Sequence, residues 1–177
     1  MSDRSIWQES FYIPSYFVGP DLRAHFPAIC YCLQEAAGNH ASQHGMGYFD
    51  MQAQQQFWVL NRLRVVMQRW PQWRETMQLK TWVSNMKGPF SYRQFELTDA
   101  QGQLLGSAST LWVLLDAVNR KPVRFDAAHF PIDTRVADCG LPDKVARVAP
   151  PASFPGPTAF HQVLPSDLDM IDHVNNV

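Results

Sequence analysis

One helical pattern followed by segments of period two constrains most strongly what this chain can fold into. Pro27 opens the stretch Ala28 to His44, and Gly45 follows it, which is the order of proline and glycine that favours a helix. Apolar residues recur along this stretch at helical spacing and predict one buried face: Ile29, Cys32, Leu33, Ala36 and Ala37. We therefore expect a helix near residues 28–44 that packs against a sheet.

The segments that follow alternate between apolar and polar residues. From Phe57 to Met67 the odd positions are mostly apolar and are expected to face inward, with Asn61 as the exception. Residues 77–84 repeat the alternation. The phase breaks near Arg93, which predicts a β-bulge at that point.

The last of these segments has small and apolar residues at both odd and even positions. A turn at Asp99 to Gly102 precedes it, and it runs from Gln103 to Asp116. Such a strand is expected to be covered on both faces. One helix and several antiparallel strands predict an α+β domain.

Composition favours a globular protein of ordinary kind, with 177 residues, 46% hydrophobic and 18% charged. Residues 1–10 lack the apolar core of a signal peptide and no run is long enough to span a bilayer, so we expect a cytoplasmic protein. Cys30, Cys32 and Cys139 are expected to be free thiols. The pair His40 and His44 has a spacing that can bind metal, but a packed helix end is the favoured interpretation, and no metal or cofactor is expected.

Basic residues gather between residues 57 and 93, although the net charge of the chain is −1. The only acid there is Glu75, and the bases are Arg62, Arg64, Arg69, Arg74, Lys80, Lys87 and Arg93. If these side chains share a face, they predict an acidic partner; solvated strand positions are the alternative. Nucleic acid is not expected, because no aromatic residues accompany the bases in a strand-binding motif.

Prolines mark a change of character after residue 120, since eight of the thirteen lie between Lys121 and Pro165. We predict a first domain over residues 1–120, a linker over 121–157 and the start of a second domain over 158–177, with a strand in 158–164. Pro165-Ser166 repeats Pro14-Ser15, so the second domain would begin as the first does. In that register Val18 takes the place of Asp169.

The end of the chain gathers acids, a histidine and two amides. Ser166 to Asp169 reads Ser-Asp-Leu-Asp, and residues 173–176 read His-Val-Asn-Asn. This order is typical of a polar loop entering a helix, whose unpaired N–H groups favour a polarised carbonyl. A helix start capped by Asp172 is the purely structural alternative. A calcium loop is disfavoured, because Asp172 stands where an EF-hand needs glycine.

These two motifs resemble the catalytic segment of the acyl-acyl carrier protein (acyl-ACP) thioesterase family. Further short motifs occur in the order found in the family: Phe11 to Tyr16 (FYIPSY), Ala36 to Ser42 (AAGNHAS), Phe57 to Leu63 (FWVLNRL) and Asn119 to Pro122 (NRKP). The resemblance implies the hot-dog fold, an antiparallel sheet wrapped around a central helix, in two tandem halves. The chain would hold one complete half and a truncated second.

The resemblance also implies a reaction and its residues. Fatty acyl-ACP thioesters would be hydrolysed to free fatty acids, with Asp169 as general base or nucleophile and His173 as the catalytic histidine. With a truncated second half, this activity is expected to be impaired. Ile171 stands where the family has a catalytic asparagine. The alternatives are an acyl-CoA thioesterase and a non-catalytic acyl-binding protein.

The same resemblance implies the partners and the surroundings of the reaction. They are an acyl carrier protein, expected to dock on Arg62, Arg64, Arg69, Lys80, Lys87 and Arg93, and a place in fatty acid biosynthesis. A truncated second half would leave bare the face of the first half that it normally covers, so we expect a homodimer through the sheet of the first half, or aggregation. Trp58, Trp82 and Trp112 fall on the expected strands, where they pack the sheet or line an acyl tunnel.

Overall fold

The computed structural model describes residues 5–125, 134, 141, 145–150, 152–153, 156, 159–169 and 174–175. The chain divides into two compact units, Met1–Val145 and Ala146–Val177. The domain boundaries predicted after residues 120 and 157 stay predictions.

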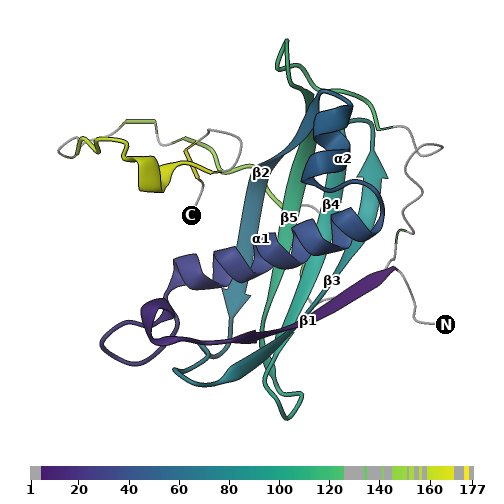
Figure 1. Ribbon diagram of the computed structural model, residues 1–177. Helices are drawn as coiled ribbons and strands as arrows, with labels where there is room; N and C mark the ends of the chain where they lie inside the picture. Colours follow the sequence, from purple (N-terminus) through teal and green to yellow (C-terminus); the bar gives the residue numbers. More distant parts are fainter. Residues whose placement is uncertain are drawn as a thin grey trace. The chain divides into compact units, whose positions relative to one another are not determined.

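The first unit is a five-stranded antiparallel sheet with a long helix across one face (Figure 1). Its elements, in chain order, are β1 (Ile6–Tyr12), the short 3-10 helix η1 (Ser15–Phe17), α1 (Phe26–Gln43), α2 (Tyr48–Ala53), β2 (Gln56–Met67), β3 (Thr76–Lys87), β4 (Phe90–Thr98) and β5 (Leu104–Asp116). The strand order is β1-β3-β4-β5-β2. The predicted α+β class and hot-dog architecture are confirmed.

Local signals set the bounds of α1. The imidazole of His25 accepts the N–H of Ala28 at 3.0 Å and so caps the first turn, where Pro27 lacks a donor in any case. Gly45 follows the helix with φ of 69°, a left-handed conformation that glycine adopts without strain. The five residues of the predicted apolar face are all buried.

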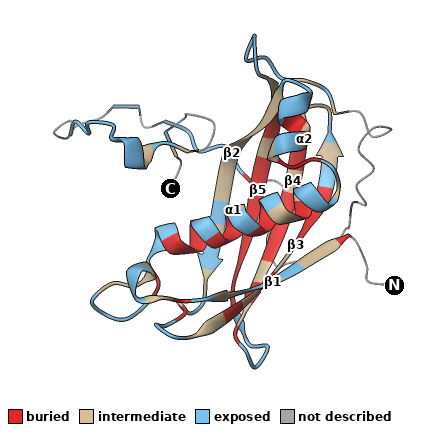
Figure 2. Ribbon diagram, in the orientation of Figure 1, coloured by how far each residue is buried: buried red, intermediate tan, exposed pale blue. Residues whose placement is uncertain are grey.

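The core lies between α1 and the inner face of the sheet (Figure 2). The larger cluster includes Ile29, Leu33, Leu79, Phe95 and Leu97, and a smaller one joins Met46, Met51 and Leu114 beyond the far end of α1. Strand β5 is buried on both parities from Leu105 to Leu111, as the sequence predicts. The predicted turn also forms, with the N–H of Gly102 donating to the carbonyl of Asp99.

Two bulges change the predicted facing of side chains. The register of β2 against β5 shifts between Leu60 and Arg62, so Asn61 is the extra residue. Trp58 and Leu60, and not Phe57 and Val59, therefore share the inner face before the bulge. That half of the period-two prediction is wrong.

The second bulge lies beside Arg93 but not on its strand. The register of β3 against β4 shifts between Val83 and Asn85, whereas β4 pairs with β5 without a break from Phe90 to Leu97. The sequence was right about the place and wrong about the strand. Arg93 consequently stays on the same face as Phe95 and Leu97, which is the face toward α1.

Some elements differ from those the sequence predicts. Strand β1 and helix α2 were not predicted, and residues 159–164, expected as a strand, are exposed and carry no strand. Residues 121–125, expected to begin the linker, lie within the first unit and pack along its sheet, because the N–H groups of Val123 and Phe125 donate to the carbonyls of Leu114 and Gly88. Within the described ranges, neither α1 nor α2 combines the length and apolarity that a membrane-spanning helix requires.

Candidate functional site

The predicted catalytic segment lies in the second unit on a turn held by Asp167. This unit contains the short 3-10 helix η2 (Pro165–Asp167). The Asp167 carboxylate accepts the N–H of Leu164 at 2.8 Å and lies 2.8 Å from Nε2 of His161. These two contacts, the backbone one first, lower the pKa of Asp167. The turn is therefore held by an ionised carboxylate.

The segment then folds back on itself. Leu168 pairs with Val174 in an antiparallel bridge, and the N–H of Asn175 donates to the carbonyl of Asp167 at 2.7 Å. Asp169 follows Leu168 and is half-buried, whereas His173, Ile171 and Asp172 lie outside the described residues. Val174 forms this bridge where the sequence suggested the first turn of a helix. The roles of Asp169 and His173 stay predictions.

The first unit contains the same arrangement before α1. There the N–H of His25 donates to the carbonyl of Phe17 at 2.9 Å, and Val18 pairs with Ala24. Each of these residues precedes its counterpart by 150 positions, as 17 and 25 precede 167 and 175. The suspected repeat is thus confirmed, but its register differs by one residue from the prediction. Gly19, not Val18, takes the place of Asp169, and the first unit still lacks an acid there.

The repeat also indicates where Asn175 stands. It occupies the position of His25, the N-cap of α1, and asparagine is among the preferred N-cap residues. The backbone that carries Asp169 is therefore the kind of backbone that leads into a helix in the first unit.

A second cluster of polar side chains lies inside the first unit, at a place where the sequence pattern predicts none. Nη1 of Arg93 lies 2.9 Å from Nδ1 of His40 and donates to Oγ1 of Thr81 at 3.2 Å. Arg93 is 4% exposed and His40 is fully buried. The predicted place of Arg93 on a basic surface is therefore wrong. We call His40, Thr81, Arg93 and the neighbouring Thr110 the interior polar layer.

Burial disfavours the charged form of the Arg93 side chain in this layer. The guanidinium loses its hydration there, and this lowers the pKa of Arg93 to about 9. Glu9 on β1 also faces α1, but its carboxylate accepts from Asn39 Nδ2 and Trp7 Nε1. In the described part of the chain, no carboxylate is paired with Arg93.

The histidine pair on α1 is packed and shows no metal site. The His40 and His44 rings meet edge to face, with centroids 4.9 Å apart. Among the described residues, no three His, Cys, Asp or Glu side chains gather as metal ligands would. The interpretation of this pair as a packed helix end is confirmed.

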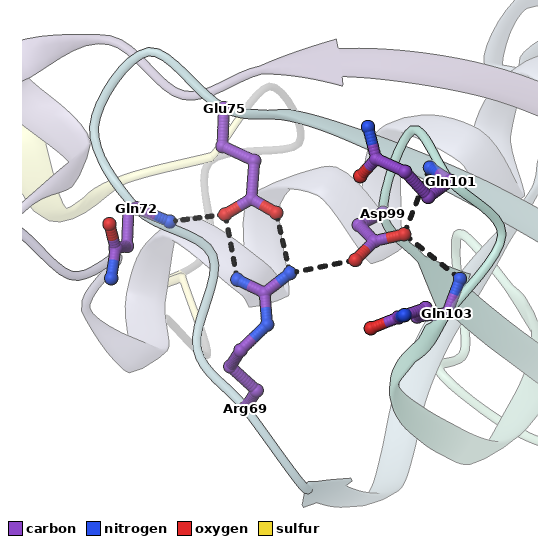
Figure 3. Close-up of polar contacts among 6 residues, drawn as sticks. All are labelled: Arg69, Gln72, Glu75, Asp99, Gln101 and Gln103. Carbon is purple, nitrogen blue, oxygen red and sulfur yellow. Dashed lines mark hydrogen bonds and ion pairs between the residues drawn. The ribbon is translucent and has the colours of Figure 1, made fainter.

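The remaining bases do not form one free basic face. Figure 3 shows the Arg69 guanidinium held between two acids, with bonds of 2.9 and 2.6 Å to Glu75 and 3.0 Å to Asp99. Lys80 lies 3.7 Å from Glu96, and Arg62 donates to the carbonyl of Val145. Of the six bases expected at the docking surface, Arg64 and Lys87 are exposed and make no such bond to another described residue.

The three strand tryptophans do not share one wall. Trp112 packs against the larger core cluster and donates to Thr110 Oγ1, whereas Trp58 packs against the smaller cluster. Trp82 is the cross-strand neighbour of Gln94, and both lie on the side of the sheet away from α1. At most two of them can border one interior acyl chain.

Comparison with known proteins places the first unit in a family. The family model described as the acyl-ACP thioesterase N-terminal domain matches residues 4–128. The chain belongs to the acyl-ACP thioesterase family. An acyl-ACP hydrolase of Cuphea viscosissima is 27% identical over 99% of this chain and 46% of its own length. Oleoyl-ACP thioesterase 2 of Arabidopsis thaliana is 28% identical over 100% of this chain and 53% of its own length.

Solved structures of the family share the fold. The chain aligns with an acyl-ACP thioesterase from Bacteroides thetaiotaomicron at a TM-score of 0.84 and 26% identity, over 97% of this chain and 69% of that one. For the 12:0-ACP thioesterase from Umbellularia californica the TM-score is 0.75, with 25% identity over 97% and 70%. The chain spans about half the length of the curated relatives it matches.

Proposed function

We propose that the protein acts in the hydrolysis of fatty acyl-ACP thioesters to free fatty acids. The observation that carries this proposal is the family match over residues 4–128, supported by the hot-dog fold of the first unit. The relatives named above are acyl-ACP hydrolases and thioesterases.

The chemistry is assigned to the loop that follows η2. Asp169 acts as general base on water or as nucleophile at the thioester carbonyl carbon, and His173 is its catalytic companion. The oxygen of water ends on the acyl carbon, the C–S bond breaks, and the carrier thiol leaves with a proton. The order that Asp167 gives to this turn supports a fixed position for Asp169.

The first unit is assigned the acyl chain. An alkyl chain needs an apolar wall, and the inner face of the sheet with α1 supplies one in residues such as Leu33, Leu79 and Phe95. The two units would thus divide acyl binding from bond breaking.

The wider setting is also part of the proposal. An acyl carrier protein is the partner, and it contacts the exposed Arg64 and Lys87. The affinity for the carrier protein should then weaken as the salt concentration rises. An affinity independent of salt would refute these contacts. We also propose that the protein forms a homodimer, which sedimentation tests, and that it acts in fatty acid biosynthesis. The free thiols Cys30 and Cys32 support a reducing compartment such as the cytoplasm.

Acyl-ACP and acyl-CoA offered separately to the purified protein test the proposal. We expect turnover of acyl-ACP, and we expect Asp169→Asn to lower the rate by about 10²–10⁴ while acyl binding stays. The matched control is Glu35→Gln, an exposed acid on α1. An Asp169→Asn rate within a few-fold of wild type would remove Asp169 from the mechanism, and equal use of acyl-CoA would favour the acyl-CoA thioesterase alternative.

One residue favours a second candidate function. Ile171 stands where the resemblance places a catalytic asparagine, and its side chain can neither donate nor accept a hydrogen bond. A non-catalytic acyl-binding protein would bind acyl-ACP without turnover. Ile171→Asn should then introduce or raise hydrolysis, whereas an unchanged rate would show that the position does not limit the reaction.

A further inference from the structure

The interior polar layer lies in the core of the first unit beside residues of both apolar clusters. Along α1, Ala37 belongs to the larger cluster, His40 to the layer and Ala41 to the smaller cluster. Along β5, Ala108 belongs to the larger cluster and Leu114 to the smaller one, with Thr110 between them, while Trp112 next to Thr110 still packs against the larger cluster. Two elements far apart in sequence thus place polar groups at one level of the core.

Arg93 supplies more hydrogen-bond donors at this level than its protein neighbours use. A guanidinium carries five N–H donors, and the contacts with His40 and Thr81 both involve Nη1. Among the described residues, no acceptor is hydrogen-bonded to Nε or Nη2. These two nitrogens form one edge of the guanidinium, with parallel N–H groups spaced to fit the two oxygens of a carboxylate.

The layer also holds a positive charge without a counter-charge in the described part of the chain. Burying a charged group without a partner is unfavourable, so buried charges are normally paired. The burial that lowers the pKa of Arg93 reflects this cost. An anion that reached the free edge of Arg93 would supply both the missing charge and the missing acceptors.

We propose that the interior polar layer binds the carboxylate of a fatty acid through the Nε and Nη2 edge of Arg93. The alkyl chain then lies among the apolar side chains next to the layer. The choice of an alkyl chain rests on the proposed function, whereas the carboxylate follows from the chemistry of Arg93. The site would hold the free acid and not the thioester, which has no negative charge.

Calorimetric titration at neutral pH tests the site with two probes of equal chain length, dodecanoate and methyl dodecanoate. Hydrogen bonds to charged groups are worth about 1.5–3 kcal/mol, so we expect wild type to prefer dodecanoate by about tenfold or more. Arg93→Met should remove that preference and leave the affinity for the ester unchanged. The control Arg124→Met replaces an exposed arginine and should behave as wild type.

Equal affinity of wild type for the two probes would overturn the proposal, and this comparison needs no variant to fold. An unchanged preference in Arg93→Met would overturn it as well. The titration involves no hydrolysis, so a thioester assay on the same sample separates the two ideas. Turnover without a carboxylate preference refutes the site alone, and a preference without turnover supports the site while counting against the hydrolase.

Discussion

Replacing the buried Arg93 by methionine should make the protein more stable. A pKa brought down to about 9 means that burial disfavours the charged guanidinium by about 5 kcal/mol, at about 1.4 kcal/mol for each tenfold change in the dissociation constant. The two hydrogen bonds from Nη1 offset roughly 1.5 kcal/mol each. Thr81 keeps a partner in the variant, because its hydroxyl also donates to the carbonyl of Gln94 at 2.9 Å. We therefore expect Arg93→Met to gain about 2 kcal/mol in free energy of unfolding.

Urea denaturation at neutral pH measures this gain, with Arg124→Met as the control that should change little. The folded-state pKa of Arg93 lies below that of the unfolded chain, so above pH 9 the unfolded chain binds more protons than the folded one. The stability of wild type relative to Arg93→Met should therefore rise with pH above 9, and the gap should narrow. A variant less stable than wild type by more than about 1 kcal/mol would refute the reasoning and make Arg93 a structural residue.

Three further outcomes follow from the contacts. Arg69→Met should lower the free energy of unfolding, measured by urea denaturation, by roughly 1 kcal/mol. The pKa values of Glu75 and Asp99 are lowered in the folded protein, so this difference between variant and wild type should vanish as the pH falls through those two pKa values. Burial raises the pKa of Cys32 to about 12, so iodoacetamide should label this thiol only after unfolding, and labelling in the native state would contradict its burial. Asp167→Ala should lower kcat about tenfold with little change in KM, because the turn before Asp169 loses its acceptor; a wild-type kcat would dissociate the turn from the chemistry.

The sequence could predict the elements that local chemistry controls. The helix was predictable because proline, glycine and a regular apolar stripe mark its ends and its buried face. The turn at Asp99 to Gly102 was predictable because Asp99 accepts the N–H groups of Gln101 and Gln103, which is the usual role of aspartate in turns. Strand β1 was missed because its edge position leaves it half exposed, with a weak alternation.

The interior polar layer was not predicted because arginine normally marks the solvent side of a strand. Two signals were nevertheless present. His40 continues the buried stripe of α1 at helical spacing from Ile29, Leu33 and Ala36, and all four are buried. Arg93 lies two residues before Phe95 and so faces the same side of β4. The apparent break in the alternation of apolar and polar residues arises because Arg93 is a polar residue on the inner face of a regular strand. Only the structure shows that these two signals meet at 2.9 Å.

The one-residue error in the repeat shows what sequence and backbone each contribute to the candidate site. Matching Pro14-Ser15 with Pro165-Ser166 aligns identical residues. The 3-10 turns begin at Ser15 and Pro165, however, so the backbone repeats at a spacing of 150 residues, one fewer than this match implies. In this register Asp169 follows the bridged residue Leu168, as Gly19 follows Val18. A Cβ at Gly19 would meet only the side chain of Asp21, with Oδ1 at 3.4 Å, and no backbone atom within 4 Å. The same turn can therefore carry a larger side chain, and the second unit uses that position for an acid.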